Sequence, residues 1–223
     1  PNSSDCFPGV DIVGGVSYFV IDSRYTGKCN YQIIRSDEVI SSDERYLDAG
    51  GCGILVRYKE MISILDKVRS RREETFDVIV SSQKPFGLRT DFLKNPAKYH
   101  LPAIQEKMMQ QSPCVSVYGL LNNKRTIEYA PVNYPFPNGT SLINKFKIFM
   151  PSTYGCSAIG ENGATPVLGE AIMAPKLSVC TETFTSIGAW DNREEMENAM
   201  SYIKTKFFRF LVGIRKTTQR VTK

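Results

Sequence analysis

Short runs of β-branched and aromatic residues predict most of the strands in this chain. Residues 14–22, Gly-Gly-Val-Ser-Tyr-Phe-Val-Ile-Asp, follow a Pro-Gly turn and form such a run, which predicts a buried strand. Residues 29–35 predict a returning strand after the turn at residues 25–28. Two further strands are expected at residues 76–80 and 146–150.

Two strand-like runs, residues 115–121 and 125–129, flank the dipeptide Asn122-Asn123. Asparagine tolerates the left-handed backbone conformation that tight hairpin turns require. We therefore expect a β-hairpin that carries Lys124 and Arg125 near its tip.

Two segments are expected to be loops because they are rich in turn-forming residues. Residues 82–90 contain Pro85 and Gly87, which favour a loop of defined shape. Residues 129–174 are rich in Pro, Gly, Asn and Ser, and we expect mostly loops there apart from the strand at 146–150. Loops of this kind often carry recognition residues.

Apolar residues spaced three and four apart predict two amphipathic helices. The first covers residues 54–71. The second begins at an Asp191 or Asn192 cap, with Glu194 or Glu195 three residues on, and continues to residue 214. The expected apolar stripes are Leu55, Tyr58, Met61, Ile62, Leu65 and Val68 in the first, and Met196, Met200, Ile203, Phe207, Leu211 and Ile214 in the second. These strands, loops and helices together predict a mixed α+β fold.

Composition narrows the class of protein. The 223 residues are 42% hydrophobic with a net charge of +5, which is typical of a globular protein and permits an anionic partner. Six cysteines without a Cys-x-x-Cys pair, and a single histidine, argue against a zinc site or a tight disulfide framework and favour the cytoplasm. No apolar run is long enough for a membrane span, and no leader is visible. Because the first residue is Pro1, we expect a piece of a larger protein.

Motifs for catalysis are missing from the sequence. The only histidine, His100, has no recognisable nucleophile near it in the chain. No Asp or Glu is followed two positions later by Lys, as the commonest metal-dependent nucleases require. We therefore expect no catalytic residue, no metal site and no bound cofactor in this chain.

Several segments resemble adenine-specific DNA methyltransferases of bacterial restriction–modification systems. One group is similar to a late strand region of the methyltransferase sheet: residues 7–12, 14–19 and 22–28. A second group is similar to the C-terminal, target-recognition part of the same enzymes: residues 84–90, 180–184 and 202–212. The resemblance implies a division into the end of a methyltransferase domain (1–35), a target-recognition domain (36–190) and a C-terminal amphipathic helix (191–223).

The resemblance also implies which partners this chain has. Its N-terminal strands would belong to the edge of the methyltransferase sheet, so the catalytic domain of the parent chain is an expected partner. The family's Asn/Asp-Pro-Pro-Tyr/Phe motif and its cofactor-binding glycine motif do not occur here. S-adenosylmethionine is therefore expected for the parent enzyme, and these residues are expected to bind double-stranded DNA without methylating it.

One aromatic residue is a candidate for contact with a flipped base. An enzyme that methylates adenine takes the base out of the stack and holds it against aromatic faces. In the family an aromatic residue just ahead of the late strand lines this pocket, and Phe7 stands at that place. The alternative for Phe7 is an ordinary core residue.

The choice of target site requires side chains that contact base edges and phosphates. Arg and Lys pair with guanine, and Asn and Gln pair with adenine. The candidates around the Pro-Phe-Gly turn and at the hairpin tip are Gln83, Lys84, Phe86, Arg89, Lys124 and Arg125. Phosphate contacts are expected from Lys204, Lys206 and Arg209 on the last helix. For each charged residue the alternative is a solvated surface position.

Two other functions remain open from the sequence alone. In one alternative, the chain is part of a restriction endonuclease whose catalytic site is not recognisable in the sequence. It is alternatively a protein-interaction module of a modification complex, which contacts its partner through the long amphipathic helix. Cleavage of DNA by the chain would favour the first, and binding of a protein but not of DNA would favour the second.

Overall fold

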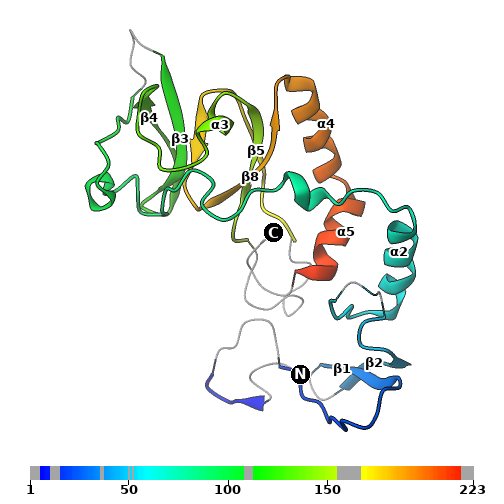
Figure 1. Cartoon of the computed structure of the whole chain (residues 1–223). Coiled ribbons are helices and arrows are strands. Elements are labelled where there is room, and N and C mark those ends of the chain that lie inside the picture. The colour runs from blue at the N-terminus through cyan, green and yellow to red at the C-terminus, as the bar shows by residue number, and fades with distance from the viewer. Residues whose placement is uncertain are drawn as a thin grey trace. The chain divides into compact units, whose positions relative to one another are not determined.

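A computed structural model describes residues 6–10, 16–35, 38–49, 51, 53–107, 113–154 and 167–216 (Figure 1). The chain divides into two compact units. Unit 1 comprises Pro1–Glu74, Gly155–Val167 and Lys206–Gln219, and unit 2 comprises Thr75–Tyr154, Leu168–Thr205 and Arg220–Lys223. Helices and small sheets are mixed in the chain, which confirms the predicted α+β class.

The described part of unit 1 contains one small sheet and two helices. Strands β1 (Cys29–Arg35) and β2 (Glu38–Arg45) pair antiparallel, so the predicted returning strand is confirmed at its predicted bounds. These two strands pair with each other, so the predicted domain boundary at residue 35 falls between two paired strands. The assignment of residues 1–35 to a methyltransferase domain and of residues 36–190 to a target-recognition domain stays a prediction. The helices are α2 (Lys59–Ser70) and α5 (Lys206–Arg215).

Arg45, the last residue of β2, forms a hydrogen bond with the segment that precedes α2. Its guanidinium lies 3.9 Å from the centre of the Tyr31 ring and donates a hydrogen bond of 2.8 Å to the carbonyl of Arg57. An ion pair of 3.5 Å joins Arg45 to Asp43, and both side chains are largely buried. These contacts offset part of the cost of burying the charge, while Nε and Nη1 of Arg45 have no hydrogen-bond partner among the described residues.

The buried strand predicted at residues 14–22 is not observed. Gly14 and Gly15 lie outside the described residues, and residues 16–22 have no strand pairing. Tyr18 is 71% exposed and Val20 is fully exposed. A strand needs a neighbouring strand for its backbone hydrogen bonds, and the described part of the chain provides none for this run.

The first helix is shorter than predicted. The sequence indicated residues 54–71, whereas α2 begins at Lys59, so Leu55 and Tyr58 precede it and are exposed. The remaining members of the predicted stripe, Met61, Ile62, Leu65 and Val68, are half-buried. The apolar face is therefore confirmed in the helix itself.

The described part of unit 2 is built on two three-stranded sheets, and Figure 1 labels β3, β4, β5 and β8 of them. In the first, β4 (Lys124–Pro131) and β3 (Cys114–Leu121) form the predicted hairpin, and β7 (Ser178–Cys180) adds parallel to β3. In the second, β6 (Ile172–Ala174) and β8 (Phe184–Trp190) flank β5 (Phe146–Pro151), which confirms the strand predicted there. The remaining elements of the unit are η1 (Phe76–Ile79), η2 (Pro96–Tyr99), α3 (Thr140–Ile143) and α4 (Arg193–Ile203).

The core of unit 2 fills the space between strands and loops. Alternate residues of β3, Val115 and Val117, are fully buried, as expected for a strand with one covered face. The ring of Phe149 on β5 contacts the rings of Tyr118 at 5.3 Å and Phe184 at 6.3 Å between centroids. Helix α4 packs on the β6-β5-β8 sheet through Met196, Met200 and Ile203, which are buried.

Residues 76–80 do not form the predicted strand. They fold as the 3-10 helix η1, and only Val80 makes an isolated antiparallel bridge, to Ile187. The side chains of Val78 and Ile79 are exposed, so the β-branched run has no sheet against which to pack. A short apolar run is compatible with either structure, and tertiary pairing decided against the strand.

The predicted last helix is divided into two. Asn192 caps α4 by accepting a hydrogen bond of 2.9 Å from the amide of Glu195, as the capping pattern indicated. The helix ends where the amide of Thr205 and its hydroxyl both donate to the carbonyl of Tyr202. This local hydrogen bonding competes with the helix ladder. In α5 Phe207 is exposed and Phe208 is buried instead, contrary to the prediction, whereas Leu211 is half-buried and Ile214 is buried, as predicted.

Candidate nucleic-acid interface

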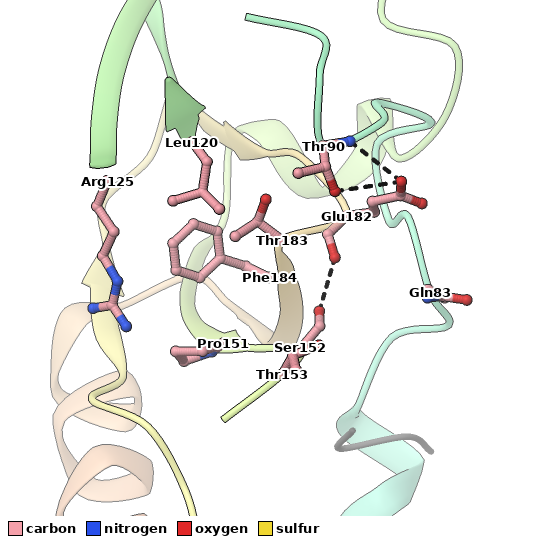
Figure 2. A pocket seen from close by; sticks show the side chains of 10 residues that line it. All are labelled: Gln83, Thr90, Leu120, Arg125, Pro151, Ser152, Thr153, Glu182, Thr183 and Phe184. Atoms are coloured by element: carbon pink, nitrogen blue, oxygen red, sulfur yellow. Dashed lines mark hydrogen bonds between the residues drawn. The ribbon is translucent and has the colours of Figure 1, made fainter. Parts of the chain in front are cut away.

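Unit 2 contains a pocket of about 340 Å³ (Figure 2). Its walls come from four places in the chain: the loop after Val80, the β3-β4 hairpin, the end of β5 with the residues after it, and the start of β8 with the residues before it. The side chains that line it are Gln83, Thr90, Leu120, Arg125, Pro151, Ser152, Thr153, Glu182, Thr183 and Phe184.

The loop that carries Gln83 and Thr90 has a defined shape. The amide of Gly87 donates to the carbonyl of Lys84 at 3.0 Å, and both residues have positive φ angles, 78° and 57°. A Cβ atom at Gly87 would lie 2.7 Å from Cβ of Pro137, so the loop approaches its neighbour closely. Phe86 and Leu88 are buried on either side of Gly87 and anchor the loop to the core. The shaped loop predicted from Pro85 and Gly87 is thus confirmed.

The opposite wall is formed by the hairpin, whose turn has the predicted conformation. Asn122 and Asn123 have φ angles of 50° and 61°, both in the left-handed region. The turn leads into Lys124 and Arg125, which are exposed. Arg125 lines the pocket, with its guanidinium carbon 5.7 Å from the centre of the Phe184 ring and Nη1 3.4 Å from the carbonyl of Glu170.

Glu182 is held in place by the loop across from it. Its amide donates to the carbonyl of Leu88 at 2.8 Å. Its carboxylate oxygen Oε1 accepts hydrogen bonds from the amide and the hydroxyl of Thr90, at 3.2 and 3.4 Å (Figure 2). The hydroxyl of Ser152 donates to the carbonyl of Glu182 at 2.9 Å. Backbone and side chain of Glu182 are therefore both fixed.

The pocket combines charges of opposite sign. Arg125 supplies guanidinium donors at one side, and Glu182 supplies a carboxylate at the other (Figure 2). Arg89 stands next to Glu182, with Nη1 3.6 Å from Oε2, and 54% of the Arg89 side chain is exposed. Gln83 adds an amide with both a donor and an acceptor. This arrangement suits a ligand that itself presents donors and acceptors.

The structure brings only part of the predicted recognition set together. Gln83 and Arg125 line the pocket, Arg89 pairs with Glu182 beside it, and Lys84 is half-buried in the same loop. Phe86 has no exposed surface, so its side chain belongs to the core and is withdrawn from the DNA-binding candidates.

The remaining candidates lie outside this pocket. Lys204 is exposed directly after α4 in unit 2. Lys206 and Arg209 are exposed on α5 in unit 1. Phe7 is also in unit 1 and is 50% exposed, so it is not the ordinary core residue that was its alternative.

Sequence reasoning did not select Glu182, Ser152 or Thr183 as site residues. Residues 180–184 had drawn attention only through a family resemblance. Their signal in the sequence is a polar turn, Thr181-Glu182-Thr183, between the apolar residues of two short strands. Because these two strands lie in different sheets, only the tertiary structure places their connecting turn beside residues 83–90.

Among the described residues, no three His, Cys, Asp or Glu side chains are grouped so that they could hold a metal ion. No helix in the described part of the chain is long and apolar enough to cross a membrane. Comparisons of the chain with protein-family models, curated proteins and solved structures gave no match.

Proposed function

We propose that this chain is the DNA-binding, target-recognition region of an adenine-specific DNA methyltransferase of a restriction–modification system. One observation carries the DNA-binding part of the proposal. Gln83 and Arg125 were selected as base-reading candidates from two separate segments, and both line the same pocket. The family resemblance of the sequence supports the rest.

The chemistry of the pocket fits the edge of a base pair. A guanidinium such as that of Arg125 pairs with O6 and N7 of guanine, and an amide such as that of Gln83 pairs with N6 and N7 of adenine. Both side chains stand on segments whose backbone is fixed by left-handed turns and buried anchors. Fixed positions reduce the entropy lost on binding, which favours selective recognition.

Phosphate contacts come from other residues in this proposal. Lys124 is exposed beside Arg125 at the end of the hairpin, while Lys204, Lys206 and Arg209 are exposed near the break between α4 and α5. Contacts between such side chains and phosphates supply affinity that is independent of base sequence.

The parent's catalytic domain is the second proposed partner, and methyl transfer and S-adenosylmethionine are assigned to that domain. The run from Tyr18 to Ile21 supports this part of the proposal, since each of its four apolar side chains is at least 71% exposed. Contiguous exposed apolar side chains mark interaction surfaces. Phe7, which is half exposed, is proposed to line the flipped-base pocket of that assembly.

Binding of the whole chain to duplex DNA tests the proposal. We expect selection from a randomised duplex pool to yield a preferred sequence. Relative to wild type, Arg125→Ala should lose about 10- to 100-fold in discrimination at one position of that sequence. Lys124→Ala should weaken binding to all sequences equally and lower the salt slope by about one.

Lys94→Ala is the matched control, because Lys94 is an exposed lysine of unit 2 that does not line the pocket. It should retain the wild-type preference. Failure of the folded wild-type chain to bind any duplex would contradict the proposal. Binding of a protein partner without binding of DNA would instead support an interaction module.

A further inference from the structure

We propose that Glu182 is a specificity-determining residue, which accepts a hydrogen bond from the exocyclic amino group of adenine or cytosine. This inference rests on the proposed DNA-binding function and extends it to an acidic side chain. The two amino groups share one chemistry, since both are donors displayed in the major groove.

The carboxylate of Glu182 is oriented through one oxygen and open at the other. Oε1 accepts the two hydrogen bonds from Thr90, which fix the plane of the carboxylate. Oε2 accepts no hydrogen bond from a described residue and meets only the guanidinium of Arg89, at 3.6 Å. That separation exceeds hydrogen-bond distance, so Oε2 retains its capacity as an acceptor.

Glu182 is pre-organised for this role. Only 18% of its side chain is exposed, and hydrogen bonds to Leu88 and from Ser152 fix its backbone. A flexible surface glutamate would lose side-chain entropy on binding, whereas this one is already ordered in the free chain. The free energy of its hydrogen bond to a base is therefore available mainly for discrimination between bases.

The charge of Glu182 argues against a phosphate in the pocket. A carboxylate repels a phosphate, and phosphate oxygens only accept hydrogen bonds, so they offer nothing to Oε2. A base pair, in contrast, presents amino donors next to ring and carbonyl acceptors. Glu182 as acceptor and Arg125 as donor are together complementary to such an edge.

The pocket offers no aromatic face for a stacked base. The only ring that lines it is that of Phe184, which is 1% exposed and packs against Phe149. Proteins that hold unpaired bases do so by stacking them on exposed aromatic side chains. The contact with Glu182 is therefore to a base edge within a duplex.

The test compares wild type with Glu182→Ala in selections from a randomised duplex pool. Alanine removes both carboxylate oxygens, whereas a glutamine amide would still pair with adenine. We expect wild type to select adenine or cytosine at one position, and Glu182→Ala to lose about 10- to 100-fold of that preference. The control Glu194→Ala removes an equal charge from an exposed position on α4 and should keep the preference.

A second arm uses the wild-type chain alone and so does not depend on the folding of a variant. At the selected position, purine replaces adenine or pyrimidin-2-one replaces cytosine, which deletes only the amino group. The analogue of the contacted base should weaken wild-type binding by about 10- to 100-fold. The substitution that has this effect, purine for adenine or pyrimidin-2-one for cytosine, identifies the base.

The outcomes separate this inference from the proposed function. If the wild-type chain selects no sequence, both fail. If it selects a sequence but neither Glu182→Ala nor any amino-deleted base alters binding, the role of Glu182 is overturned while DNA recognition stands.

Discussion

Units 1 and 2 differ most in where they place their apolar side chains. In the described part of unit 1 the buried apolar residues are Val56, Phe208 and Ile214, whereas unit 2 holds a continuous core around Phe149. In unit 1, each of the four apolar side chains from Tyr18 to Ile21 is instead at least 71% exposed. Burial of apolar surface drives folding, so unit 2 is stabilised from within, and unit 1 would gain stabilisation if the proposed partner covered this run.

The difference also explains where the candidate site lies. The pocket of unit 2 is lined by residues whose neighbours in sequence are buried, such as Glu182 next to Thr181 and Thr183 next to Phe184. Side chains supported in this way keep their positions without a ligand. Unit 1 presents exposed apolar and basic residues on segments with fewer buried anchors, which suits a surface that becomes ordered against a partner.

Removal of a phenylalanine ring from each unit should have the largest effect on this comparison. Phe149→Ala in unit 2 deletes a fully buried ring and should lower the free energy of unfolding by about 3–5 kcal/mol. Phe19→Ala in unit 1 deletes a ring that is 78% exposed and should change it by no more than about 0.5 kcal/mol. Urea unfolding followed by circular dichroism measures both. Equal losses of unfolding free energy in the two variants would show that both rings are buried to a similar extent, contrary to this comparison.

The buried lysine of unit 2 should make stability depend on pH. Burial lowers the pKa of Lys147 from 10.5 to about 8. Its ammonium nevertheless has partners, since it donates to the carbonyls of Ile143, Lys145 and Pro175. Burial also raises the pKa of the neighbouring Cys180, so no thiolate forms to offset the lysine charge.

Lys147→Met removes this titration while keeping an unbranched side chain. Above the folded-state pKa of about 8 and below 10.5, the unfolded chain binds more protons than the folded chain, so stability rises with pH. The stability of wild type relative to Lys147→Met should therefore increase by up to about 3 kcal/mol between these limits. Below pH 8 the difference should be constant. Parallel stability curves above pH 8 would contradict the assignment.

The caps of two helices should give the smallest effect. Asn192 caps α4 in unit 2, whereas Tyr58 at the start of α2 in unit 1 makes no capping hydrogen bond through its side chain. Asn192→Ala should cost about 1 kcal/mol, and Tyr58→Asn should stabilise α2 by a similar amount. Thermal unfolding of both variants measures this. A loss of stability in Tyr58→Asn would show that the Tyr58 ring matters more than the missing cap.

Elements with their own local signals were predictable. The Asn122-Asn123 turn, the strand at residues 29–35 and the Asn192 cap all depend on neighbours within a few residues, and the structure has each of them. The strands expected at residues 14–22 and 76–80 were wrong in the parts the structure describes, because strand formation needs a distant partner.

For the candidate site, residue types and local shape were predictable from the sequence alone. It indicated Gln83 and Arg125, and it predicted the loop and the hairpin that carry them. Three features depend on the tertiary structure: these two residues share a pocket, Phe86 is buried in the core, and Glu182 is oriented by Thr90. Local backbone preferences act over a few residues, whereas burial and side-chain pairing depend on segments far apart in the chain.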